Sequence, residues 1–205
     1  MPLPFSHIVY ADKILQEQLK NNKIDTKEYF IGATYPDIRY LVRDERKITH
    51  PKFKNSQEIL DKTKREKRSF ELGLLIHWYI DKKWEEYWLF IFNKNKKEYH
   101  KNVRLIEFLG DQILYDKFDK NKIITTYFNK PINQETNQYD IKDIERWHQF
   151  IKKALSKKIN YELVYEWSQI FGVKKSFIDE IIYQIEKIEN KQEIIKKIEN
   201  FEKEL

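Results

Sequence analysis

Apolar residues recur at spacings of three and four along most of the chain, which is the period of an amphipathic α-helix. The first such stretch carries its apolar positions at Ile8, Ala11, Ile14, Leu15 and Leu19. No two segments show the alternation of apolar and polar residues that is typical of paired strands, and glycine and proline, which interrupt helices, are scarce. We therefore predict an all-α fold, built as one multi-helix domain over residues 1–205.

Helix boundaries follow from capping residues and from the ends of the apolar repeats. The pattern predicts helices over about 6–21, 26–32, from 56 onward, 69–93, 98–118, 140–157, 160–171 and 176–203. Ser6, Thr26 and Ser69 are the expected N-terminal caps, and Ser56 is expected to begin a polar helix.

Two segments are predicted to be loops. Residues 34–51 contain Pro36 and Pro51, which disfavour helix immediately before them, so this charged segment is expected to be irregular. Ordered loops of this length often carry function. Residues 119–139 are rich in Asn, Lys and Thr and are expected to form a surface loop.

The predicted C-terminal helix over 176–203 carries a long apolar stripe with charged residues between its members. The stripe consists of Ile178, Ile181, Ile182, Ile185, Ile188, Ile194, Ile195, Ile198 and Phe201. It packs either against the rest of its own domain or against a coiled-coil partner, so an oligomer formed through this helix is the alternative.

Composition excludes several classes of chemistry. The chain has 39 Lys and Arg against 33 Asp and Glu, a net charge of +6, and this modest excess is weak evidence for a nucleic-acid partner. The absence of cysteine excludes disulfides, thiolate nucleophiles and cysteine-ligated metals. The four glycines are isolated from one another, so neither a P-loop nor a dinucleotide-binding fingerprint is present.

Residues 1–7 contain neither a basic leader nor an apolar run of signal-peptide length. The most apolar stretch, residues 70–80, contains His77 and is followed by charged residues, which is typical of a buried helix rather than a membrane span. We therefore expect a cytoplasmic protein.

The distribution of histidine indicates a metal site. His77 and Asp81 are four residues apart on the predicted helix 69–93, so their side chains share one face. Asp37 follows a proline in the predicted loop, His50 lies later in the same loop, and His7 belongs to the first turn of the first helix. Imidazole and carboxylate ligands suit zinc, manganese or iron.

Taken in chain order, the pieces are His7, Gly32-Ala33-Thr34-Tyr35-Pro36-Asp37, Thr49-His50 and Gly73-Leu74-Leu75-Ile76-His77-Trp78-Tyr79-Ile80-Asp81. This pattern resembles the zinc-dependent phospholipase C and single-strand nuclease superfamily, and most closely its small bacterial members. The resemblance covers about residues 2–90. It implies an all-helical phospholipase C fold, with the zinc site in that part and a supporting helical part over about 140–205.

The resemblance also implies the ligands. Asp37, His50, His77 and Asp81 would hold one zinc ion, and Asp81 would bridge to a second metal that His7 also binds.

Two further features of the superfamily concern the size of the metal cluster. In secreted relatives the free α-amino group helps to bind the second metal, and removal of Met1 would here expose Pro2, five residues before His7. Those relatives also carry a second His-x-x-x-Asp pair, but neither His100 nor His148 is followed by Asp at that spacing. We therefore expect one or two zinc ions rather than three.

Such a site would make hydroxide available near neutral pH, and hydrolysis is its natural output. We expect Asp81 to act as the catalytic bridging and orienting group. Arg39 and Arg43, together with Arg46, offer forked donors that match a phosphate. The resemblance therefore implies a zinc-dependent hydrolase acting on a phosphodiester or a phosphomonoester.

Two alternatives stay open. The missing second His-x-x-x-Asp pair favours a catalytically inactive, metal-stabilised helical scaffold or binding protein. A basic helical protein that binds nucleic acid without catalysis is the third hypothesis, and it would show steep salt dependence.

Other polar and aromatic residues receive structural interpretations. Glu107, Asp111 and Asp116 are expected on a solvated helix face, although each could lend a carboxylate to the cluster. Trp84 and Trp88 are expected in the core, with the wall of a cleft as the alternative.

Overall fold

The computed structural model describes residues 4–19, 23–117, 139–156, 161–170, 172–187 and 191–205. Within these ranges all regular secondary structure is helical, which confirms the predicted all-α class. No helix among the described residues is both long enough and apolar enough to cross a membrane.

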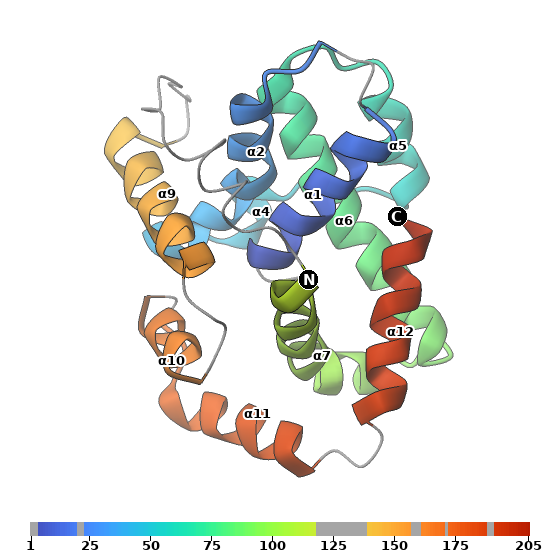
Figure 1. Cartoon of the computed structure of the whole chain (residues 1–205), viewed down its shortest axis with the longest axis vertical. Helices are drawn as coiled ribbons and strands as arrows, with labels where there is room; N and C mark the ends of the chain where they lie inside the picture. Colours follow the sequence, from blue (N-terminus) through green and yellow to red (C-terminus); the bar gives the residue numbers. More distant parts are fainter. Residues whose placement is uncertain (1–3, 20–22, 118–138, 157–160, 171, 188–190) are drawn as a thin grey trace.

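The helices of the first half surround the long helix α6 (Figure 1). Their bounds are α1 (Pro4–Glu17), α2 (Thr26–Thr34), the 3₁₀ helix η1 (Tyr35–Ile38), α3 (Arg39–Val42), α4 (Arg46–Thr49), α5 (Ser56–Thr63), α6 (Ser69–Ile91) and α7 (Lys96–Lys117). The second half contributes α9 (Ile141–Ser156), α10 (Tyr161–Ile170), α11 (Lys175–Lys187) and α12 (Lys191–Glu204). Helix α9 lies beside η1 and α3, whereas α11 and α12 both contact α7.

Helices α2 and α6 touch backbone to backbone where Gly32 lies opposite Gly73. A Cβ atom added at Gly32 would lie 2.1 Å from the carbonyl oxygen of Phe70, and one added at Gly73 would lie 2.1 Å from that of Tyr29. Both distances are far shorter than van der Waals contact, so only glycine fits at either position. The crossing fixes the end of α2 against the middle of α6.

Three predicted N-terminal caps are wrong. Helix α1 begins at Pro4, so Ser6 lies inside it; Asp25 rather than Thr26 caps α2 by accepting a hydrogen bond from the amide of Glu28. Ser69 occupies the first turn of α6, where its hydroxyl accepts a hydrogen bond from the amide of Asp25. A serine in the first turn of a helix can form a hydrogen bond with a distant segment instead of capping its own helix. Local sequence spacing does not distinguish these two roles.

The predicted loop over 34–51 is largely helical, because η1, α3 and α4 occupy most of it. Pro36 lies in the first turn of η1, where its missing amide hydrogen is not needed. Arg43 ends α3 in the left-handed conformation, with φ of 61°. The predicted loop over 119–139 lies outside the described residues except at Tyr139, whose hydroxyl donates to Asp44 over 2.8 Å.

The predicted helix over 176–203 is two helices, α11 and α12. Ile198 and Phe201 on α12 are fully buried, and the Phe201 ring meets Trp84 at 4.9 Å between centroids. Trp84 and Trp88 are at most 1% exposed, so they belong to the core and do not line a cleft. This part of the C-terminal stripe therefore packs on its own chain.

The close crossing of α2 and α6 leaves no room for a side chain at Gly73. Gly73→Ala must push α2 and α6 apart, and we expect it to lower the free energy of unfolding by about 2–3 kcal/mol or more. Urea denaturation measures this change. The matched control is Gly110→Ala on α7, where a new Cβ would meet only a Trp84 side-chain atom at 3.5 Å. That substitution should be neutral or stabilise by up to about 1 kcal/mol, as is usual when alanine replaces a helical glycine. Equal effects of the two substitutions would contradict the crossing.

Candidate metal centre

Five side chains from four segments of the first 81 residues meet in one buried cluster: His7, Asp37, His50, His77 and Asp81. None of the five is more than 7% exposed. Suitable donor atoms of His7, His77 and Asp81 lie within 4.8 Å of one another, and so do those of Asp37, His50 and His77. The structure thus brings together all five residues that the sequence predicts as ligands, with His77 in both groups.

Asp37 and His50 are placed by two short helical segments. Asp37 lies in η1 directly after α2, and His50 is the C-terminal cap of α4. Two indole groups hold the neighbouring backbone: Trp147 donates to the carbonyl of Thr34 and Trp78 to that of Thr49, both over 3.0 Å. These bonds fix the segments from which Asp37 and His50 project.

The geometry at His77 determines which of its ring nitrogens carries a proton. Its Nδ1 lies 2.8 Å from the carbonyl oxygen of Ala33, which can only accept, so Nδ1 is the donor. In the neutral ring Nε2 then presents a lone pair to the cluster. Burial, followed by the nearby charge of His7, holds the pKa of His77 well below its ordinary value, which favours this neutral form.

The Nε2 atoms of His50 and His77 face each other at 3.1 Å. The Nδ1 of His50 lies 2.8 Å from the hydroxyl of Thr49, which can either donate to it or accept from it. Two lone pairs at this separation would repel, so the contact needs a proton on His50 Nε2 or a cation that both nitrogens bind. A metal ligand pair satisfies the second condition.

Asp37 is a buried carboxylate in need of a cation. It is fully buried, and neither of its oxygens has a hydrogen-bond partner among the described residues. Its nearest ion-pair contact is 3.7 Å, between Oδ2 and His7 Nδ1. Burial raises its pKa, and leaving such a group without a donor or cation is costly.

Asp81 lies between the histidines and an arginine. Its Oδ1 is 3.1 Å from His7 Nε2, while its Oδ2 is 3.4 Å from His50 Nε2 and 2.7 Å from Arg46 Nη2. Burial opposes ionisation, but hydrogen bonds from His50 and His7 outweigh it and hold the pKa of Asp81 well below its usual range. These donors therefore suit a metal ion. The ionised carboxylate of Asp81, the carboxylate of Asp37, which lacks a hydrogen-bond partner in the described part of the structure, and the imidazole nitrogens all lie close together.

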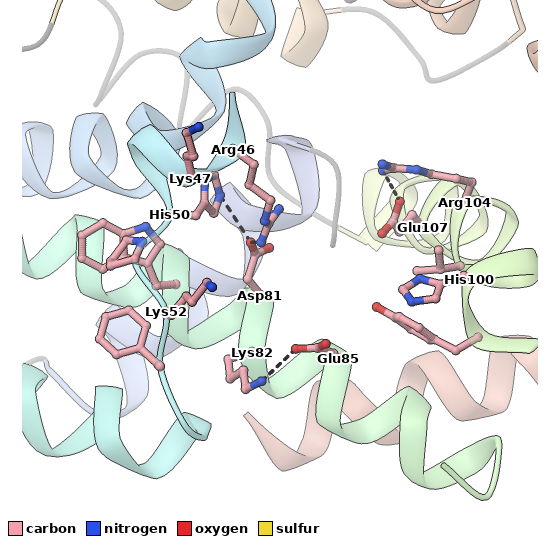
Figure 2. A pocket seen from close by; sticks show the side chains of 15 residues that line it. Arg46, Lys47, His50, Lys52, Asp81, Lys82, Glu85, His100, Arg104 and Glu107 are labelled. Atoms are coloured by element: carbon pink, nitrogen blue, oxygen red, sulfur yellow. Dashed lines mark hydrogen bonds and ion pairs between the residues drawn. The ribbon is translucent and has the colours of Figure 1, made fainter. Parts of the chain in front are cut away.

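A cavity of about 700 Å³ opens onto His50 and Asp81 (Figure 2). It lies between α6, α7 and the segment that includes α4 and residues 50–53. Arg46 lines it, half-exposed, whereas Arg39 and Arg43 are not among its lining residues. Arg39 instead lies over the Tyr40 ring, 3.9 Å from the centroid. The cavity gives a molecule from solvent access to one side of the cluster.

Two acidic residues of α7 are not where the sequence predicts them. Glu107 and Asp111, expected on a solvated face, are 1% and 0% exposed. Glu107 pairs with Arg104 over 2.8 Å, and Asp111 accepts hydrogen bonds from the amide and the hydroxyl of Ser6. Their burial could have been inferred from their spacing, because Glu107 and Asp111 follow the buried Val103 at intervals of four residues on one helix face. The side chain of Asp116 lies outside the described part of the structure.

The remaining candidates stay outside the cluster. His148 is buried on α9, and burial lowers its pKa to about 4. His100 lines the cavity but belongs to neither group of donors. The predicted role of the Pro2 amine lies outside the described residues.

Comparisons with known protein families, with curated proteins and with solved structures find no match to this chain.

The burial of Asp111 predicts a pH dependence of stability. Burial raises the pKa of Asp111 to about 8, so between about pH 4 and pH 8 the folded state keeps a proton that the unfolded state has lost. The contribution of Asp111 to the free energy of unfolding therefore falls as pH rises through this window, by up to about 1.4 kcal/mol per pH unit. Asp111→Asn removes the titration and keeps an oxygen for Ser6. We expect its stability relative to wild type to rise between pH 5 and pH 8 by roughly 2–4 kcal/mol in urea denaturation. The exposed Asp61→Asn is the control, and a gap independent of pH would refute the assignment.

Proposed function

We propose that His7, Asp37, His50, His77 and Asp81 form a zinc centre, and that the protein is a zinc-dependent hydrolase of phosphoesters. The observation that carries this proposal is the contact between two imidazole Nε2 atoms at 3.1 Å beside a buried carboxylate that lacks a hydrogen-bond donor. A divalent cation satisfies all three groups at once.

The resemblance to the phospholipase C and single-strand nuclease superfamily supplies the reaction class and the expected phospholipase C fold. Asp37, His50, His77 and Asp81 would hold one ion, and His7 and Asp81 a second one if two are bound. Manganese or iron would also suit these nitrogen and oxygen donors.

In this proposal the chain's residues orient the reactants. Zinc bound here would lower the pKa of water toward neutrality and so supply the nucleophile. Asp81 holds its two oxygens toward different histidines and is thus the orienting group. Arg46, fixed by Asp81 and half-exposed in the cavity, is positioned to bind a phosphate oxygen.

The depth of the cluster favours a second candidate, the metal-stabilised scaffold or binding protein. His7, Asp37 and His77 are all 0% exposed, as in a structural metal site that is closed to solvent. The cavity beside Asp81 and His50 supports the enzyme instead, because an open side is what a substrate needs.

Metal content tests the centre itself. Untagged wild-type protein should carry one or two equivalents of zinc in elemental analysis, and His77→Ala and Asp37→Asn should each lose at least one equivalent. Loss of the metal should also lower the thermal unfolding temperature, because zinc binds the folded state only. His148→Ala, which removes a buried histidine outside the cluster, controls for damage to the fold. Unchanged zinc in the cluster variants, or none in wild type after zinc is supplied, would rule out the centre.

Turnover tests the reaction. We expect zinc-loaded wild type to hydrolyse bis-p-nitrophenyl phosphate, and Arg46→Gln to lower kcat/KM by about 10²–10³-fold, the usual loss for one donor to developing charge. Zinc content should stay unchanged in this variant.

Arg65→Gln, an exposed arginine away from the cavity, is the matched control. Arg43→Gln tests the phosphate-binding role that the sequence predicts for Arg43. If Arg43→Gln lowers kcat/KM more than Arg46→Gln does, Arg43 is the residue that binds the phosphate. If wild type binds zinc but shows no turnover, the metal-stabilised scaffold is favoured.

A further inference from the structure

Cations outnumber acids around the cavity beside the cluster. Among its described lining residues the cations are Arg46, Lys47, Lys52, Lys82 and Arg104, and the acids are Asp81, Glu85 and Glu107. The excess of positive charge is present before any metal is counted. A bound metal would increase it further.

Each acid of the lining is already matched by one cation. Arg46 pairs with Asp81 at 2.7 Å, Lys82 with Glu85 at 2.9 Å and Arg104 with Glu107 at 2.8 Å. The excess therefore resides on the two remaining lysines, Lys47 and Lys52.

Neither lysine is neutralised from within the cavity. Lys47 pairs with Glu45, but the two side chains are 75% and 70% exposed and Glu45 is not a lining residue. Such an exposed pair contributes little and gives way readily to another anion. Lys52 has no ion pair with any residue that the structure describes.

Both lysines lie on the same side of the cavity as His50 (Figure 2). Arg104 and Glu107, which neutralise each other, lie on the opposite side. Phe53 and Trp78 also line the cavity and contact each other, with 5.7 Å between ring centroids. One wall thus combines uncompensated positive charge with aromatic surface, and the other is nearly neutral.

We propose that the substrate carries a second anionic group, a phosphate or a carboxylate, that Lys52 and Lys47 bind while the scissile phosphate lies at Arg46 and Asp81. The inference rests on the proposed function, because it presumes that the cavity is where the phosphoester binds. It narrows the substrate class to phosphoesters with negative charge beyond the reacting group. The aromatic pair offers an apolar surface to the part that links the two anions.

A matched pair of substrates tests this proposal. The p-nitrophenyl ester of thymidine 5′-phosphate is compared with the same ester bearing a 3′-phosphate, so that leaving group and chemistry are identical. We expect the bisphosphate to have a KM about tenfold lower with little change in kcat, as an added phosphate group near two ammonium groups would give. The advantage should shrink as salt is raised, because the lysines are exposed.

The double variant Lys47→Gln/Lys52→Gln should abolish the preference for the 3′-phosphate and keep turnover of the simpler ester. The control Lys54→Gln/Lys67→Gln makes the same charge change at two exposed lysines that do not line the cavity, and it should keep the preference. Equal KM values for the two esters in wild type, or a preference that survives in the double variant, would overturn the proposal.

A binding measurement separates this proposal from the proposed function. Calorimetric titration compares thymidine 3′,5′-bisphosphate with thymidine 5′-monophosphate on wild type and on both double variants. If no ester is hydrolysed but the bisphosphate binds about tenfold more tightly through the two lysines, the hydrolase fails and the anion-binding wall stands. If turnover is present and binding shows no preference, the wall fails and the hydrolase stands.

Discussion

The contact between Gly32 and Gly73 is the constraint on which the rest of the site depends. Because neither helix has a side chain at this point, the backbones of α2 and α6 meet, and the carbonyl of Ala33 reaches Nδ1 of His77. That bond fixes the ring so that Nε2 turns into the cluster. The end of α2 is fixed by the same contact, and η1, which carries Asp37, follows at once. A wider crossing would move Asp37 away from His77, which lies on α6.

The cluster concentrates ionisable groups where the protein can least easily tolerate them. Two carboxylates and three imidazoles lie in the core with few hydrogen-bond donors from outside the group, and burial alone disfavours their charged forms. An apolar core of the same volume would be at least as stable, so the arrangement calls for a functional reason. A bound cation would remove the main cost, because it would compensate Asp37 and both facing imidazoles together. Arg46 supplies part of that compensation from the cavity side, which links the stability of Asp81 to the surface that a substrate would contact.

The hydrophobic pattern predicts the features that depend on residues close together in sequence, such as helices and shared helix faces. It predicts few contacts between distant segments. Helix period identified α6, and the spacing of His77 and Asp81 predicted their shared face. His7, Asp37 and His50 joined them through the distribution of histidine and through the resemblance, since no periodicity relates residues on different segments. Asp111 accepts a hydrogen bond from Ser6, which is 105 positions away in sequence. Local spacing therefore predicts neither the contact of Asp111 with Ser6 nor the position of Ser6 inside α1. The short helices α3 and α4 were missed because packing, not propensity, makes four-residue helices.

Metal binding by the five side chains is what the site's chemistry depends on. The most direct measurement is the anomalous diffraction of crystals grown with zinc, recorded at the zinc absorption edge. We expect a peak among Asp37, His50, His77 and Asp81, with nitrogen and oxygen donors at about 2.0–2.2 Å and the two Nε2 atoms moved apart to receive the ion. A peak only at surface residues, or none, with His50 and His77 still in direct hydrogen-bond contact, would contradict it.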